Sequence, residues 1–147
     1  MKRWLLLSAF LLAALADYPR LHRKLLRYQS HRVAKAATAQ IATQLHDGDL
    51  IFHISQSAQS RAIQLATHSP YSHYGIVYKE AGNWQVFGAV QPVKRTPLAD
   101  WVARGQGGHF VTKRLRDAKA VLTPAALARL KAAGQPMLGH NYDQYFG

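Results

Sequence analysis

Two strand-like segments separated by a short turn most constrain the fold of this chain. Residues 72–79 (SHYGIVYK) and 84–90 (WQVFGAV) are rich in aromatic and β-branched residues, and Ala81-Gly82-Asn83 lies between them. Such residues favour strands, and a short connection that contains glycine favours a β-hairpin. We therefore expect two adjacent antiparallel strands in the middle of the chain.

Turn and capping signals divide the rest of the chain from residue 47 onward into further elements. In order, the sequence predicts a strand at 50–52 after the turn at 47–49, a helix at 58–67 capped by Ser57, a short helix that Pro97 opens and that runs to residue 104, a loop at 105–108, a strand at 109–115 and a helix at 124–133. This order predicts an α+β domain, in which helices flank a small, largely antiparallel sheet.

Residues 1–16 have the layout of an export signal. Two basic residues precede an apolar run from Trp4 to Ala16 that only Ser8 interrupts. As a helix, this run rises about 20 Å, whereas the hydrocarbon core of a bilayer is roughly 30 Å thick. We expect a secretory signal peptide or a short anchor, with a buried helix as the alternative.

Residues 17–46 are expected to form a basic amphipathic helix. Residues 1–46 hold eight Lys/Arg and one acid, Asp17. Such a helix can rest on anionic lipid head groups, or it can pack on the domain by its apolar side. The export pattern places the chain in a bacterial cell envelope, in the periplasm or anchored to the membrane, although positive charge directly after an apolar run favours the cytoplasmic side.

Composition excludes several kinds of function. The chain contains no cysteine, which excludes disulfides, zinc–thiolate sites and a thiolate nucleophile within it. The net charge of +12 raises nucleic acid as a partner. However, the sequence has no recognised nucleic-acid-binding motif, and its aromatic residues do not alternate with basic ones. We therefore expect neither a nucleic-acid partner nor a cofactor.

His73 is the first candidate catalytic residue. It begins the strand at 72–79, where alternation places His73, Gly75 and Val77 on one face and Tyr74 on the other. Gly75 predicts open space on the side of the histidine. A histidine at the entrance of a strand can act as a general base near neutral pH, although a lone histidine is more often structural.

Five segments keep their order across about 100 residues of the chain. They are 48–52 (GDLIF), 59–67 (QSRAIQLAT), 69–77 (SPYSHYGIV), 93–105 (VKRTPLADWVARG) and 141–146 (NYDQYF). These segments resemble the YiiX-like permuted papain-fold cysteine hydrolases, which form the permuted branch of the NlpC superfamily. The third segment is the most specific of the five.

The resemblance implies a catalytic set in permuted order: a histidine on a strand, an acidic residue on the next strand and a cysteine at a helix start. His73 matches the histidine of the family. Gly88 stands where members of the family have glutamate, and a glycine cannot orient an imidazole. In relatives a strand and a Tyr-Cys-Ser-Glu-type helix start follow the last segment, whereas this sequence stops at Gly147. We therefore expect residues 47–147 to be an incomplete, C-terminally truncated permuted papain-like domain without its last helix.

The family resemblance also implies a function. It indicates a hydrolase or acyltransferase that acts on amide or ester bonds of peptide or lipid at the cell envelope. Without a nucleophile or an acidic partner, the chain as written is expected to be inactive. The alternative is a non-catalytic envelope or lipid-binding module that keeps the fold.

The remaining candidate groups give weaker signals. Three serines are possible hydroxyl nucleophiles but lack an evident pair of base and orienting group: Ser57, Ser60 and Ser72. Four histidines have no short metal-ligand spacing, so we expect no metal site: His53, His68, His109 and His140. The sequence identifies no substrate-binding residues.

Overall fold

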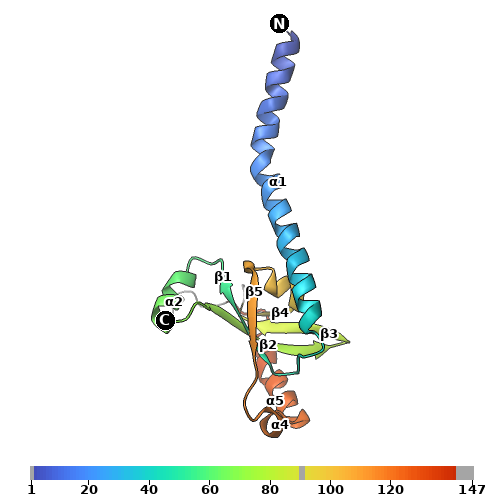
Figure 1. Cartoon of the computed structure of the whole chain (residues 1–147), viewed down its shortest axis with the longest axis vertical. Coiled ribbons are helices and arrows are strands. Elements are labelled where there is room, and N and C mark those ends of the chain that lie inside the picture. The colour runs from blue at the N-terminus through green and yellow to red at the C-terminus, as the bar shows by residue number, and fades with distance from the viewer. Residues whose placement is uncertain (1, 90–91, 142–147) are drawn as a thin grey trace.

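The computed structural model describes residues 2–89 and 92–141, with the side chains of residues 17–89 and 92–141. A long helix, α1, extends away from a domain built on one sheet (Figure 1). The elements are α1 (Lys2–Ile41), β1 (Leu50–Ser55), α2 (Ser60–Thr67), β2 (His73–Glu80), β3 (Asn83–Gly88), β4 (Lys94–Pro97), α3 (Leu98–Val102), β5 (Gly105–Lys113), α4 (Ala118–Val121), α5 (Pro124–Gly134) and a final 3₁₀ turn (Gln135–Met137).

The sheet has five strands in the order β4-β3-β2-β1-β5. Every neighbouring pair is antiparallel, and β2 and β3 form the expected hairpin with Glu80 opposite Asn83. The predicted α+β class and the antiparallel sheet are therefore confirmed. The register also places His53 of β1 directly opposite His73 of β2.

Several boundaries differ from the sequence-based expectation. Residues 105–108 are not a loop, because β5 begins at Gly105, which pairs with Ser55 across an irregular register. Residues 105–108 lack the alternating pattern of a strand, so the sequence did not indicate one there. Gly107 and Gly108 have positive φ, and such residues and β-bulges allow a strand to bend. Pro97 ends the edge strand β4, where no N–H is needed for pairing, and is the N-cap of α3 rather than its first residue.

The helix at 58–67 starts two residues later than expected, because Ser57 does not cap it by its side chain. Its carbonyl instead accepts a hydrogen bond from the N–H of Ser60, and Gln59 occupies the N-cap position. The predicted helix at 124–133 is confirmed, with the side chain of Thr123 accepting a hydrogen bond from the N–H of Ala126.

The C-terminal part of α1 belongs to the core of the domain. Ala34, Thr38 and Leu45 are buried, and Ala34 and Leu45 join the core formed by the sheet and α3. The other buried members of this core are Ile51, Val77, Val86, Leu98, Trp101 and Val102. The helix is continuous through residue 16 and ends at Ile41. None of the helices, within the described residues, combines the length and apolarity needed to cross a membrane.

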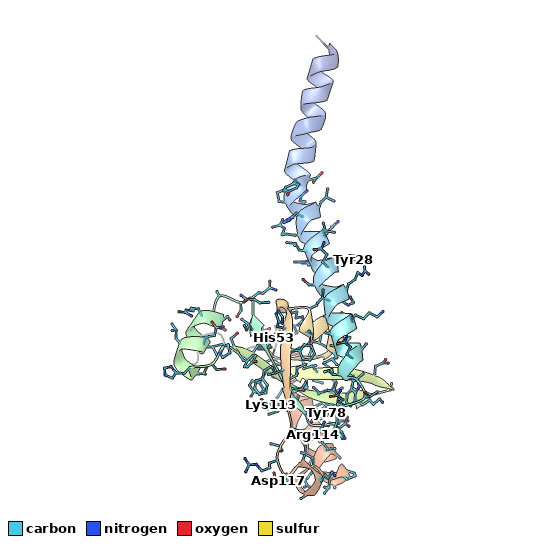
Figure 2. The ribbon with its side chains drawn as sticks, in the orientation of Figure 1. Tyr28, His53, Tyr78, Lys113, Arg114 and Asp117 are labelled. Atoms are coloured by element: carbon cyan, nitrogen blue, oxygen red, sulfur yellow. The ribbon has the colours of Figure 1, made fainter. Side chains whose placement is uncertain are left out.

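An ion pair joins the end of α1, the start of β1 and the end of β5. The Arg114 guanidinium donates from Nε and Nη2 to the two carboxylate oxygens of Asp49, each over 2.7 Å. Nη2 also donates to the carbonyl of Gln44, and the N–H of His46 donates to Asp49. Burial opposes ionisation of Asp49, but these hydrogen bonds and the positive charge of Arg114 lower its pKa overall. Arg114 lies where β5 leaves the sheet (Figure 2).

We expect Arg114→Met to lower the free energy of unfolding by about 1.5 kcal/mol, because it leaves the Asp49 carboxylate buried without its bidentate partner. Partial exposure of the guanidinium keeps this figure below that of a fully buried pair. Arg114→Lys should lose part of the stability, since an ammonium cannot reproduce the two-pronged contact. The measurement is the urea midpoint at constant m-value, with the exposed Arg116→Met as the control. Equal midpoints for Arg114→Met and Arg116→Met would contradict the prediction.

Candidate functional site

Two histidines and a tryptophan form a stacked cluster on the face of the sheet that α3 covers. The Trp101 indole lies 4.0 Å from the His53 ring and 5.7 Å from the His73 ring, measured between centroids. The two imidazoles lie 5.3 Å apart. His53 and Trp101 are buried, and His73 is half-buried at the start of β2. Figure 2 marks His53 within the sheet, far from α4 and α5.

Glycines allow these rings to approach the sheet so closely. A Cβ at Gly105 would lie 2.9 Å from His53 Nδ1, so β5 can pass the imidazole only as glycine. A Cβ at Gly75 would collide with Val86 and lie 2.9 Å from the carbonyl oxygen of Phe87. The expectation of open space at Gly75 was therefore wrong: the position is closed, and glycine is required there by packing.

Gly88 differs from these two glycines. A Cβ there would lie 3.4 Å from Trp101 Nε1 and 3.6 Å from the carbonyl oxygen of Tyr74, which are ordinary contact distances. Its φ is not positive, so the backbone accepts an L-residue. Gly88 also lies beside Gly75 of the neighbouring strand. Gly75 follows His73 by two residues in β2 and is on the same face of the sheet. A Cβ at position 88 would therefore lie against Trp101 without displacing the backbone.

Burial and a nearby positive charge disfavour the protonated form of both imidazoles. Burial lowers the pKa of His53 to about 4, with His73 and Arg104 adding to the shift by charge repulsion. Burial also lowers the pKa of His73, again with a contribution from Arg104. A neutral imidazole can accept a proton, but it cannot stabilise a neighbouring thiolate as an imidazolium does.

The polar edges of the cluster have no hydrogen-bond partners. His53 Nδ1, His73 Nε2 and Trp101 Nε1 are buried, and none of them contacts a donor or acceptor among the residues that the structure describes. Buried polar atoms without partners cost free energy and are rare. Of these atoms, Trp101 Nε1 lies beside Gly88, the position where the family resemblance implies a glutamate, and His53 Nδ1 lies beside Gly105.

The serine candidates do not form a catalytic pair with His73. The hydroxyls of Ser60 and Ser72 lie 2.7 Å apart and are buried, and the Ser72 oxygen accepts a hydrogen bond from the N–H of Ser55. Because His73 Nε2 has no partner within the described part of the chain, no serine there donates to it. Ser57 is exposed in the loop after β1. The hydroxyls of Ser60 and Ser72 therefore stabilise the loop before β2.

The other histidines lie apart from the cluster, except His53. His68 ends α2 with a positive φ of 50°, and His109 and His140 are exposed. Sequence reasoning did not predict that His53 lies opposite His73. The two residues are twenty positions apart, and only the register of β1 with β2 brings them together. An antiparallel pairing of residues 50–53 with residues 73–76 would have predicted this contact, because it places His53 opposite His73.

Comparison with known proteins now identifies the family. The family of permuted papain-like amidase enzymes that includes YaeF and YiiX matches residues 44–147. The chain belongs to this family. It is 44% identical over 105 residues to the uncharacterized protein YiiX of Escherichia coli (strain K12), covering 71% of this chain and 50% of YiiX.

A solved structure supports the same fold. The crystal structure of the metalloprotein yiiX from Escherichia coli O157:H7 shares 44% sequence identity and superimposes with a TM-score of 0.62, over 68% of this chain and 54% of that chain. The predicted permuted papain-like fold is thus confirmed. The chain spans about half the length of these relatives.

The low pKa of His53 predicts a loss of stability in acid. In the unfolded chain His53 takes up a proton near pH 6.5, whereas in the folded protein it does so only near pH 4. The free energy of unfolding should therefore be highest above pH 6.5 and fall by roughly 3 kcal/mol as the pH drops to about 4. Denaturant midpoints between pH 7 and pH 4 measure this slope. His53→Phe should reduce the slope and the exposed His109→Gln should keep it; an unchanged slope in His53→Phe would contradict the prediction.

A carboxylate at position 88 should raise the pKa of His73. In Gly88→Glu the negative charge favours the imidazolium and gives Trp101 Nε1 or His73 Nε2 an acceptor. NMR titration of the His73 ring protons measures the pKa, and Gly88→Gln is the neutral control of the same shape. Equal His73 pKa values in the two variants would mean that position 88 does not face the histidine.

Proposed function

We propose that this chain is a family member that binds, rather than cleaves, a peptide or lipid of the bacterial cell envelope. The observation that carries the proposal is His73 in the stacked cluster with His53 and Trp101, where its Nε2 has no hydrogen-bond partner among the described residues. His73 is proposed to correspond to the histidine of the catalytic set. The chain contains no thiol, and Gly88 supplies no carboxylate.

The chemistry of the cluster supports binding better than catalysis. A papain-like reaction needs a thiolate as nucleophile, an imidazolium to stabilise it and an acceptor to orient the imidazole. Of these groups the chain has only the imidazole, and burial lowers its pKa, which disfavours the imidazolium form. When one member of such a set is absent, the others add little rate, because they act as a unit.

The basic N-terminal helix supports a place at a membrane surface. Residues 18–33 of α1 are largely exposed, including the apolar side chains of Tyr18, Leu21 and Leu25. Exposed basic and apolar side chains on one helix suit the interface of an anionic bilayer. A periplasmic or membrane-anchored location, with residues 1–16 as a signal peptide or anchor, belongs to this proposal.

A metal has no part in this proposal. The Escherichia coli O157:H7 relative is described as a metalloprotein. In the part of this chain that the structure describes, no three His, Cys, Asp or Glu side chains lie close enough to hold a metal ion. His53 and His73 are stacked ring on ring rather than aimed at one point. The donor set therefore does not fit a metal.

Hydrolysis assays test the absence of catalysis. We expect no cleavage of p-nitrophenyl esters or of N-acyl p-nitroanilides that depends on His73, with papain as the positive control. Slow turnover that is equal in the wild type and in His73→Ala would reflect binding alone and would agree with the proposal. Turnover that His73→Ala abolishes would overturn it.

Vesicle binding tests the role of the helix. Sedimentation with phosphatidylcholine vesicles, with and without phosphatidylglycerol, should show binding that needs the anionic lipid and weakens as salt is added. Removing residues 17–46 is unsuitable, because Ala34 and Leu45 belong to the core. The double variant Arg23→Gln/Lys24→Gln changes only exposed positions and should bind more weakly, whereas Arg61→Gln/Arg129→Gln changes the net charge equally and should not. Equal loss in both double variants would refute a specific role for α1.

A further inference from the structure

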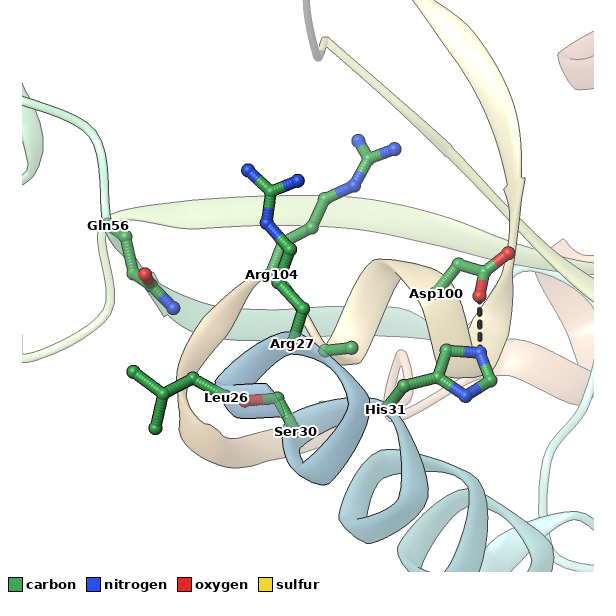
Figure 3. A pocket seen from close by; sticks show the side chains of 8 residues that line it. Leu26, Arg27, Ser30, His31, Gln56, Asp100 and Arg104 are labelled. Atoms are coloured by element: carbon green, nitrogen blue, oxygen red, sulfur yellow. Dashed lines mark hydrogen bonds and ion pairs between the residues drawn. The ribbon is translucent and has the colours of Figure 1, made fainter. Parts of the chain in front are cut away.

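A pocket lined by two arginines lies where α1 meets the domain. It has a volume of about 490 Å³. One wall is α1, with Leu26, Arg27, Ser30 and His31, and the other is formed by Gln56 and the end of α3, with Asp100, Ala103 and Arg104. Figure 3 shows the guanidinium groups of Arg27 and Arg104 pointing to the same side of this pocket.

The charges in the pocket are not balanced. Its one acidic residue, Asp100, is already engaged, because its Oδ1 lies 2.7 Å from His31 Nε2. Neither Arg27 nor Arg104 contacts a carboxylate within the described residues. Two like charges facing one cavity repel each other, and an anion between them would relieve that repulsion.

The donors in the pocket suit a phosphate group better than a carboxylate. Each guanidinium offers a planar fork of N–H donors, and the Ser30 hydroxyl adds another. The Gln56 amide nitrogen already donates to the carbonyl of Gly105 over 3.2 Å, which leaves its second N–H. A carboxylate has two coplanar oxygens and satisfies one such fork, whereas the free oxygens of a phosphate ester, three on a monoester and two on a diester, diverge tetrahedrally and can bridge two arginines. The volume leaves room for a group attached to the phosphate.

We propose that Arg27 and Arg104 together bind a phosphate group, in a site formed between α1 and α3. This site goes beyond the proposed function, since it stands whether or not the chain contacts a membrane. The phosphate can come from a phospholipid head group or from a soluble phosphate ester, because both present the same oxyanion.

The site is electrostatically connected to the histidine cluster. Arg104 directly precedes Gly105, which packs against the His53 ring, and the charge of Arg104 contributes to the lowered pKa of His53 and of His73. A bound phosphate would offset that charge. Occupancy of the pocket would therefore raise the pKa of both imidazoles, which gives a spectroscopic readout apart from binding itself.

Calorimetric titration of the full chain with inorganic phosphate tests the proposal. We expect binding that Arg27→Gln and Arg104→Gln each weaken by about tenfold or more, as expected for the loss of a charge-assisted contact. Arg129→Gln on α5 removes the same charge far from the pocket and should bind like the wild type. Circular dichroism of each variant checks that it is folded.

A competition experiment distinguishes a phospholipid head group from a soluble phosphate ester as the ligand. If glycerol 3-phosphate binds and phosphatidylglycerol vesicles compete with it, the source is a lipid head group; if vesicles do not compete, the site takes soluble phosphates. The proposal is overturned if the wild type binds no phosphate, if acetate binds as tightly, or if the Arg27→Gln/Arg104→Gln variant retains binding. None of these results bears on the hydrolysis assays, so the two proposals fail separately.

Discussion

The packing of Trp101 against the sheet is the contact on which the rest of the domain depends. Its indole is fully buried, stacks on His53 at 4.0 Å and faces Gly75 and Gly88. An indole can lie so close to a sheet only where the strands beneath it carry no side chains, and Gly75 provides that gap at the cost of strand propensity. Through Trp101, α3 is fixed to β1, β2 and β3 at once. The position of Arg104, directly after α3, follows from the same contact.

This packing also determines the state of the histidines. Stacking on Trp101 shields the buried His53 and the half-buried His73 from water, and burial is the largest cause of their lowered pKa values. In a complete papain-like set, a carboxylate would offset that cost by accepting a hydrogen bond from the imidazole. With Gly88 in place, the cost is not offset and three polar atoms lack partners in the described region. The chain keeps the fold of the permuted papain-like amidases, and the unpartnered imidazole is the basis of our proposal that it binds rather than cleaves.

The long helix α1 has two roles that divide along its length. Toward its C-terminus it is a core element, with Ala34 fully buried, and residues 44–49 are tied to β5 by Arg114. Residues 26–31 of α1, which lie between the exposed residues 18–25 and the buried Ala34, form one wall of the arginine pocket. The wall of the pocket and the core element are thus parts of one continuous helix. A ligand held there would lie next to the histidine cluster.

The sequence by itself determined the α+β class, the hairpin of β2 and β3, the helix at 124–133 and the family, because these depend on local residue preferences and on motifs contiguous in the chain. It also singled out His73 and the glycine at position 88. Only the tertiary structure decided that His53 lies opposite His73, that Gly75 is closed by Val86, and that Arg27 and Arg104 share a pocket. These facts join residues from 11 to 77 positions apart. Strand register and helix docking are set by the packing of the whole core around Trp101, and local sequence carries no record of that packing.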